Sequence, residues 1–127
     1  MKYLLDTNAL IGLLFSPAFL SDDAREIVEQ SSELYVSIIS LWELGIKQSI
    51  GKIDIDASAE ELESFCNELG ISVVTILASE IDVMKTLPLI HRDPFDRLLI
   101  AQAIFRDMTL ITKDERIPQY PNVRVLW

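Results

Sequence analysis

The stretch Tyr3-Leu4-Leu5-Asp6-Thr7-Asn8 joins a short apolar run to an acid and two polar residues. We predict that residues 3–5 form a buried strand and that Thr7-Asn8 begin a helix extending to about Leu14. An apolar run that ends in cap-forming side chains is typical of a strand-to-helix junction. The rest of the chain repeats this order of strand and helix, and the repetition indicates the fold class.

Further strands and helices are predicted along the whole chain. The strands cover residues 34–36, 71–75, 109–112 and 123–126. The helices cover residues 37–50, 58–70 and 79–87, with one more beginning at Ser21-Asp22-Asp23 and another at Asp93-Pro94. Strands separated by helices usually form parallel sheets that are covered on both faces, since parallel neighbours need long crossover connections. The predicted fold class is α/β, a three-layer α/β/α sandwich with a central, mostly parallel sheet of four to five strands.

Length and composition predict one domain over residues 1–127. The chain has 127 residues, 50% of them hydrophobic, and a mean hydropathy of +0.27, which is enough to bury a core. The longest uncharged run, Thr7 to Ser21, has 15 residues, fewer than the roughly 18 apolar residues that span a bilayer. Asp6 and Asn8 interrupt any secretory signal. We therefore expect a cytoplasmic protein that does not bind membranes.

Four acids interrupt apolar stretches of the chain and are the first candidates for chemistry. They are Asp6, Glu43, Asp96 and Asp114. Carboxylates are seldom buried unless their charge is compensated. Asp6 and Asp114 follow predicted strands, and ligands of open α/β sheets bind at the carboxyl ends of strands. The pattern predicts a shared cation, either Mg²⁺ or Mn²⁺, because both prefer carboxylate and water oxygens.

Each acid also has an interpretation that involves no ligand. Asp6 is placed to cap a helix, and Glu43 is placed to face solvent beside Lys47, its i+4 neighbour. Asp96 lies in a first helical turn, where the helix dipole stabilises negative charge. Asp114 is placed to cap a short helix that ends at Pro118. Four acids in such positions are harder to explain one by one than together.

The net charge of −9 argues against indiscriminate binding to nucleic acid, which depends on lysine and arginine at phosphates. Divalent ions at an acidic cluster weaken this objection, because they attract phosphate themselves.

Several motifs resemble the PIN domain family and, more narrowly, VapC-type toxin ribonucleases of type II toxin–antitoxin systems. The motifs are Leu5-Asp6-Thr7-Asn8, Trp42-Glu43-Leu44, Thr112-Lys113-Asp114 and the stretch Arg92-Asp93-Pro94-Phe95-Asp96-Arg97-Leu98-Leu99-Ile100-Ala101-Gln102-Ala103. The resemblance implies a metal-dependent endoribonuclease whose acidic quartet is Asp6, Glu43, Asp96 and Asp114. It also implies a homodimer and a cognate antitoxin protein that inserts a segment near the site.

The resulting hypothesis is hydrolysis of RNA by one or two Mg²⁺ or Mn²⁺ ions held by the quartet. Residues expected to orient the carboxylates are Thr7, Asn8, Asp93 and Thr112. Weaker candidates for gripping phosphates are Arg92, Arg97, Lys113 and Arg116. His91 is not needed as a base and is expected to lie on the surface beside a helix, and Cys66 is expected to be a buried structural thiol.

Other functions remain open at this stage. A catalytically silent interaction module would use aromatic side chains in a groove, namely Phe15, Phe19, Trp42 and Trp127, although such residues more often belong to a core. A phospho-accepting receiver-like domain needs a lysine on a later loop, and Lys113 directly before Asp114 fits this poorly. DNA as the substrate would use the same chemistry as RNA.

Overall fold

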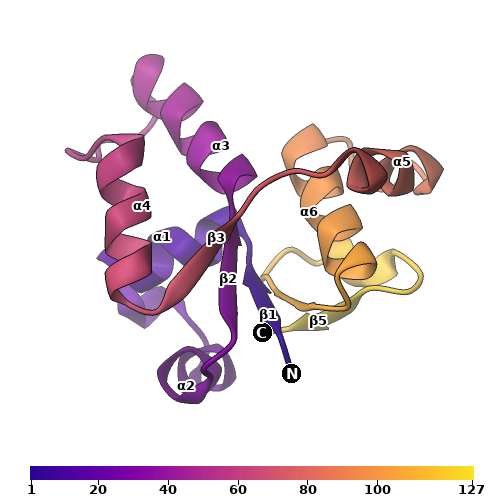
Figure 1. The fold of residues 1–127 in the computed structure, drawn as a ribbon, viewed down its shortest axis with the longest axis horizontal. Helices are drawn as coiled ribbons and strands as arrows, with labels where there is room; N and C mark the ends of the chain where they lie inside the picture. The colour runs from indigo at the N-terminus through magenta and orange to yellow at the C-terminus, as the bar shows by residue number, and fades with distance from the viewer.

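Five short parallel strands form the central sheet of the computed structural model, which describes residues 1–127 (Figure 1). The strands are β1 (Tyr3–Leu5), β2 (Leu34–Ser37), β3 (Ile71–Val74), β4 (Thr109–Ile111) and β5 (Arg124–Leu126). Their order in the sheet is β3-β2-β1-β4-β5, so β1 lies at the centre. Every pairing is parallel, with Leu4 of β1 opposite Tyr35 on one side and Leu110 on the other.

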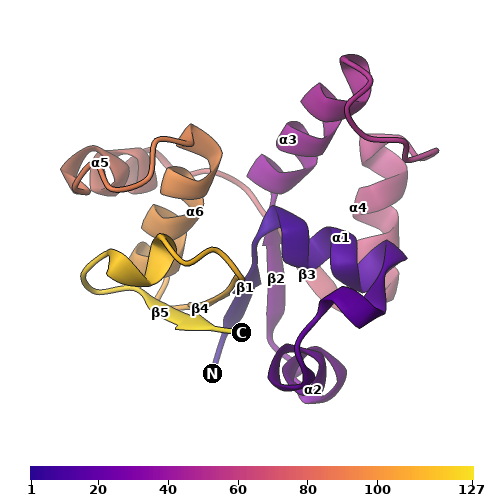
Figure 2. The same cartoon turned by 180° about the vertical axis from the view of Figure 1, so that it is seen from behind.

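Helices cover both faces of this sheet, as the two opposite views in Figures 1 and 2 show. One side carries α1 (Thr7–Phe15), α2 (Asp22–Gln30), α3 (Ile38–Ser49) and α4 (Ala59–Glu68). The other side carries α5 (Ala78–Thr86) and α6 (Pro94–Phe105). The three-layer α/β/α sandwich with a parallel sheet is confirmed.

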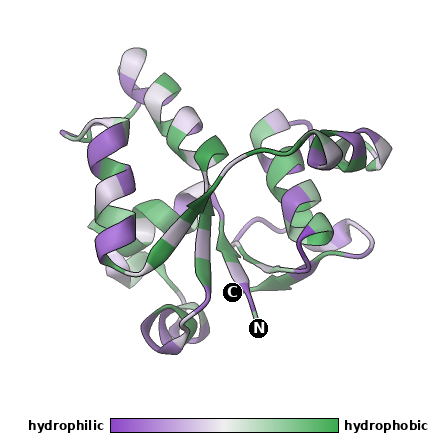
Figure 3. Cartoon of the chain, viewed as in Figure 1, coloured by the Kyte–Doolittle hydropathy of each residue, from purple (hydrophilic) through white to green (hydrophobic).

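The alternation of side chains along each strand produces two separate hydrophobic cores. In β1, Leu5 enters the core beneath α1 to α4, while Leu4 enters the core beneath α6. In β4, Ile111 and Leu110 divide in the same way. Successive residues of a strand point to opposite faces, so a strand buried on both faces reads as a continuous apolar run. Figure 3 shows apolar colour through the strands and on the helical surfaces that face them.

The expected caps form at most helix starts. Ser21 caps α2, Asp93 caps α6 with Pro94 in the first turn, and Ser58 and Glu61 form a capping box at α4. The short helix expected between Asp114 and Pro118 lies further along the chain than predicted. Instead of ending a helix, Pro118 lies inside a short 3₁₀ helix over Ile117–Gln119, because a proline in a first turn loses no intrahelical hydrogen bond.

The aromatic side chains depart from the expectation that they belong to a core. Trp42 is 57% exposed, and Phe15 and Phe19 are also exposed. Trp42 packs edge-on against Phe95, and Phe19 packs edge-on against Trp127, so each pair joins an exposed ring to a half-buried ring at the edge of a core. Cys66 is fully buried, as expected for a structural thiol. None of the helices has the length and apolar character needed to cross a membrane.

Candidate active site

The candidate site lies at the carboxyl ends of β1 and β4, where the strand order changes direction. From β1 the chain crosses over to β2 on one side of the sheet, whereas β4 lies on the other side. Ligands of open α/β sheets bind at such a switch point. Asp6 follows β1 directly, and its main-chain N–H donates to the carbonyl of Ile111, the last residue of β4, at 3.1 Å. Asp114 follows on the loop after β4.

The four predicted acids converge on this point from different elements. The charges of Asp114 and Glu43 act on Asp6, and the charges of Asp6 and Glu43 act on Asp96. Glu43 comes from α3, which follows β2, and Asp96 comes from the first turn of α6. The fold therefore brings together residues that are as much as 108 positions apart, from Asp6 to Asp114.

Asp6 is both a helix cap and a buried acid. Its Oδ1 accepts a hydrogen bond of 2.7 Å from the main-chain N–H of Ala9 in α1. Burial raises the pKa of Asp6 to about 6, hydrogen bonds from Thr112 and Ala9 offset part of this rise, and the charges of Asp114 and Glu43 add to it. One carboxylate thus serves the helix and the cluster together.

Glu43 does not lie on a solvent-facing side of α3. It is only 9% exposed, although Lys47 does pair with it at 3.0 Å from Nζ to Oε2. The Thr7 hydroxyl donates to Glu43 Oε1 at 2.8 Å and so fixes the carboxylate, while the Ser40 hydroxyl, 2.9 Å from Thr7, can donate to it in turn. The interpretation of Glu43 as a surface residue is wrong, because α3 packs its apolar residues and Glu43 against α1 and α6.

Asp93 and Asp96 have different roles at the start of α6. Asp93 Oδ1 accepts from the main-chain N–H groups of Phe95 and Asp96, which occupies it as the cap. Asp96 is left to face the cluster. Burial and the charge of Asp93 together raise the pKa of Asp96 to about 7, against the opposing effect of His91.

Among the four acids of the cluster, Asp114 accepts the most hydrogen bonds. Arg116 donates to Oδ1 from its main-chain N–H and from Nε, and to Oδ2 from Nη2, at 2.9 to 3.1 Å. Burial acts to raise the pKa of Asp114, but the hydrogen bonds from Arg116 and His91 outweigh it and lower the pKa to about 2. Asp114 therefore stays charged under conditions in which Asp6 and Asp96 take up protons.

His91 is the residue whose position differs most from the sequence-based expectation. It is only 3% exposed rather than on the surface, and its Nε2 lies 3.0 Å from Asp96 Oδ2 and 2.9 Å from Asp114 Oδ2. Its place five residues before Asp96, within the same polar stretch, was the one signal available in the sequence. Burial of a segment between two helices is a tertiary effect that this spacing does not reveal.

The remaining candidates occupy different surroundings. Thr112 is buried, and its hydroxyl accepts from the main-chain N–H of Asp114 at 3.1 Å. Asn8 and Arg92 are exposed, and Lys113 lies over the ring of Phe19 at 5.3 Å. Arg97 donates to the main-chain carbonyls of Met84, Leu87 and Pro88, so its guanidinium joins the end of α5 to α6.

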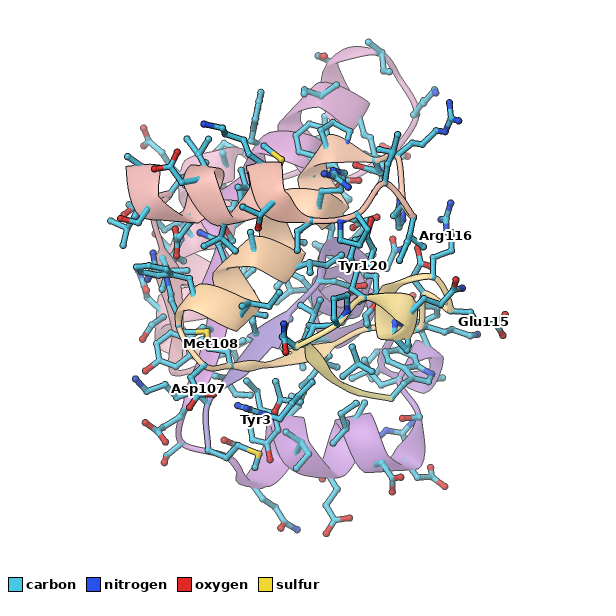
Figure 4. The ribbon with its side chains drawn as sticks, turned by 90° about the vertical axis from the view of Figure 1, so that its right-hand side faces the viewer. Tyr3, Asp107, Met108, Glu115, Arg116 and Tyr120 are labelled. Carbon is cyan, nitrogen blue, oxygen red and sulfur yellow. The ribbon has the colours of Figure 1, made fainter.

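Figure 4 shows residues beyond both ends of β4, with Arg116 past its carboxyl end and Asp107 before its other end. Arg116 and Glu115 lie on the outer side of the loop that follows β4, and Tyr120 lies inward of them, near α6. Asp107 and Met108 lie at the opposite end of this strand. Asp107 is therefore an acid of the same chain that is remote from the cluster.

The donor set fits a hard divalent cation. One carboxylate oxygen of Asp96 lies within 4.8 Å of one of Asp114, and the carboxylates of Asp6 and Glu43 act on the same group. A pocket of about 390 Å³ lined by Asp6, Asn8, Phe19, Lys113, Asp114 and Glu115 opens beside it. Carboxylate oxygens at this density are the ligands that Mg²⁺ and Mn²⁺ prefer.

Comparison with known proteins agrees with this architecture. The PIN domain family model matches residues 3–123. The chain is 28% identical over 125 residues to ribonuclease VapC22 of Mycobacterium tuberculosis, covering 95% of this chain and 93% of that protein.

Solved structures with a similar fold come from toxin–antitoxin complexes. One is the crystal structure of VapBC2 from Rickettsia felis bound to a DNA fragment from their promoter, with a TM-score of 0.72, 19% identity and coverage of 99% of this chain and 98% of that chain. Another is DNA-bound VapBC from Salmonella typhimurium, with a TM-score of 0.66, 18% identity and coverage of 99% and 97%. At these identities the structural matches establish the fold alone.

Proposed function

Because the chain belongs to the PIN domain family, we propose that it is a metal-dependent endoribonuclease and the toxin component of a toxin–antitoxin pair. The likeness to ribonuclease VapC22 supports hydrolysis of RNA phosphodiester bonds. The proposed cofactor is Mg²⁺ or Mn²⁺, as one or two ions, and the whole of residues 1–127 is proposed to act as a single nuclease domain.

The observation that carries this proposal is the convergence of four acids without enough local positive charge to keep all of them ionised. Asp6 and Asp96 have pKa values raised to about 6 and about 7, chiefly by burial. Two carboxylates about 5 Å apart repel each other by roughly 3 kcal/mol at an effective dielectric constant of 20. A divalent cation bound between the carboxylates relieves this repulsion, so the cluster is stabilised by the ion that we propose as cofactor.

The four acids have two roles in the proposed site. Asp6, Asp96 and Asp114 would hold the cation, and Glu43 would act on it through water. When bound, Mg²⁺ or Mn²⁺ supplies positive charge that polarises water and stabilises the charge developing on the phosphate.

The surrounding hydroxyls orient these carboxylates. Thr7 fixes Glu43, and Thr112 hydrogen-bonds Asp6 and accepts from the main-chain N–H of Asp114. Residues that orient ligands in this way govern both metal affinity and activity. Asp93 acts indirectly, by holding the first turn of α6 that carries Asp96.

The proposed RNA contacts come from exposed cations at the rim. Arg92 and Lys113 are exposed, with Lys113 lining the pocket beside the cluster. Arg116 is already engaged with Asp114, and Arg97 with main-chain carbonyls, so these two arginines are weaker candidates for phosphate binding.

The proposed protein partners follow from the structural neighbours. The Rickettsia, Salmonella and Klebsiella structures are all toxin–antitoxin complexes, and a chain from the Klebsiella complex matches with a TM-score of 0.63 and 18% identity over 99% of this chain and 97% of that chain. We therefore propose a cognate antitoxin as the inhibitor, and we propose a homodimer on the family resemblance alone. Co-expression with a small gene found adjacent to the one that encodes this chain, followed by co-purification, tests the first of these.

An RNA cleavage assay tests the proposed activity and its dependence on the four acids. Purified protein is incubated with single-stranded RNA in the presence of Mg²⁺, Mn²⁺ or EDTA, and cleavage products are measured. Asp6→Asn and Asp96→Asn should abolish cleavage, because the amide keeps the shape of the side chain and removes its charge. Asp107→Asn is the matched control, since this exposed acid lies at the opposite end of β4 and its φ of 56° suits asparagine.

The outcomes separate this proposal from the alternatives. Cleavage that persists in EDTA, or in both site variants, would contradict the role of the acids. Absence of cleavage by the wild-type chain together with capture of an antitoxin would favour a catalytically silent interaction module. Cleavage of DNA in place of RNA would retain the chemistry and change the substrate.

A further inference from the structure

We propose that His91 is a positioning residue that holds the carboxylates of Asp96 and Asp114 on a shared N–H, and that it is not itself a metal ligand. This inference rests on the proposed function, because the carboxylates it positions are those assigned to the cation. His91 Nε2 lies 3.0 Å from Asp96 Oδ2 and 2.9 Å from Asp114 Oδ2. Both distances are within the range of charge-assisted hydrogen bonds.

The other ring nitrogen determines which atom carries the proton. His91 Nδ1 accepts a hydrogen bond from the main-chain N–H of Asp93 at 3.1 Å. A ring nitrogen that accepts a hydrogen bond carries no hydrogen of its own. The hydrogen of the neutral imidazole is therefore on Nε2. Nε2 can then donate to the two carboxylates, but it has no free lone pair to offer to a cation.

The backbone of His91 is held as firmly as its ring. Its main-chain N–H donates to the Tyr120 hydroxyl at 2.7 Å, and Arg97 Nη1 donates to the same hydroxyl at 3.3 Å. Tyr120 is buried and follows the 3₁₀ helix after Asp114, on the inner side of that loop in Figure 4. His91 therefore connects the start of α6 to the loop after β4, which are the two segments that carry Asp96 and Asp114.

The two carboxylates need this shared donor for different reasons. Asp114 accepts three hydrogen bonds from Arg116, and His91 supplies a fourth at Oδ2. Asp96 has no other side-chain donor within hydrogen-bond distance among those that the structure records. Loss of the His91 donor therefore leaves Asp96 free to rotate away from the cluster.

A pair of amide substitutions separates the two ring nitrogens. His91→Asn keeps an acceptor near the position of Nδ1, but its amide is too short to reach the position of Nε2. His91→Gln places an amide N–H near the position of Nε2. Calorimetric titration with Mn²⁺ should give about a 10- to 100-fold loss of affinity for His91→Asn, the range found for residues that orient metal ligands. His91→Gln should recover most of that loss.

A second readout uses the wild-type chain, in which His91 is the single histidine. Two-bond ¹H–¹⁵N spectra of the imidazole at pH 8 report which nitrogen carries the hydrogen. We expect the Nε2–H form both before and after Mg²⁺ is added. Movement of the hydrogen to Nδ1 on addition of Mg²⁺ would mean that Nε2 binds the ion directly, and this result would overturn the proposal.

The outcomes also distinguish this proposal from the proposed function. If the wild-type chain takes up neither Mn²⁺ nor Mg²⁺, the metal-dependent nuclease fails. If the wild-type chain binds Mn²⁺ and His91→Asn binds it equally well, only the positioning role fails. Should His91→Asn not fold in a thermal melt, His91→Gln decides, because a folded Gln variant with the full 10- to 100-fold loss would contradict a donor role.

Discussion

The main-chain N–H of Asp6 donates to the carbonyl of Ile111 at 3.1 Å, which extends the pairing of β1 and β4 to the first residue of the site. This hydrogen bond fixes the distance between the two central strands where Asp6 and the loop to Asp114 leave the sheet. The acids of the cluster are therefore positioned by rigid elements, and their repulsion cannot be relieved by moving the strands apart. It must be relieved by protons or by a cation.

Stability of the metal-free protein should fall as the pH rises from about 4 to about 7. The pKa values of Asp6 and Asp96 are raised from 3.8 to about 6 and about 7, so the folded state binds more protons than the unfolded state within this window. The free energy of unfolding then decreases with pH, by an amount on the order of a few kcal/mol for both groups together. Urea denaturation at pH 5 and pH 7.5 measures the difference.

Two variants and the opposite behaviour of Asp114 provide the controls for this pH effect. Asp6→Asn and Asp96→Asn should each flatten the dependence, because an amide does not titrate. Asp114, whose pKa is lowered to about 2, stabilises the fold above the pKa of the unfolded chain and loses this effect only in acid below pH 4. A metal-free protein that becomes more stable between pH 5 and pH 7.5 would contradict the assignment.

Binding of Mg²⁺ should release protons near pH 7. Asp6 and Asp96 are partly protonated there in the metal-free protein, and cation ligands must be deprotonated. Calorimetric titration at pH 7 in buffers of different ionisation enthalpy measures the number of protons released. We expect release to diminish at pH 8 and affinity to weaken at pH 5.5. Heats that are independent of the buffer would show that these acids are already ionised before the ion binds, which would contradict their raised pKa values.

Thr7→Val should reduce metal affinity and cleavage about 10-fold or more, because the Glu43 carboxylate loses the hydroxyl that lies 2.8 Å from it. Valine has nearly the same shape as threonine, so packing is retained. Thr7→Ser keeps the hydroxyl and should behave like the wild-type chain. Equal activity of the Val and Ser variants would exclude an orienting role for this hydroxyl.

Glu80→Ala should destabilise the fold by about 1–3 kcal/mol, the cost of leaving buried hydrogen-bond donors without their acceptor. Glu80 is fully buried, pairs with Arg106 and accepts hydrogen bonds from Gln102 and the main-chain N–H of Leu77. Chemical denaturation measures the loss. Glu63→Ala on α4 is the matched control, since an exposed helix position should change stability by no more than about 0.5 kcal/mol.

The two helical glycines Gly12 and Gly45 should respond oppositely to alanine. A Cβ on Gly45 meets nothing within 4 Å, so Gly45→Ala should stabilise α3 by about 0.5–1 kcal/mol. A Cβ on Gly12 would lie 2.8 Å from the ring of Phe19, and moving that ring disturbs its contact with Trp127. Gly12→Ala should therefore be less stable than Gly45→Ala by about 1 kcal/mol or more. Equal melting temperatures of the two variants would contradict this.

The sequence alone predicted the elements and their order, because local signals determine them. Apolar runs gave the strands, the three-and-four spacing gave the helices, and cap residues such as Ser58 and Asp93 gave helix starts. Alternation of strand and helix then implied a parallel sheet, and with it the edge at which Asp6 and Asp114 lie. These inferences need only the neighbours of each residue along the chain.

Tertiary structure alone decided which side chains are buried together. His91 and Glu43 both had plausible surface positions in the sequence, and both are buried because elements distant along the chain pack over them. The exposed Trp42 is the opposite case, an aromatic residue whose helix leaves it in solvent. Burial depends on contacts between elements far apart in sequence, and burial is what raises the pKa values of Asp6 and Asp96. Residue types and spacing therefore identified the acids, but the three-dimensional packing determined their charge and the histidine that two of them share.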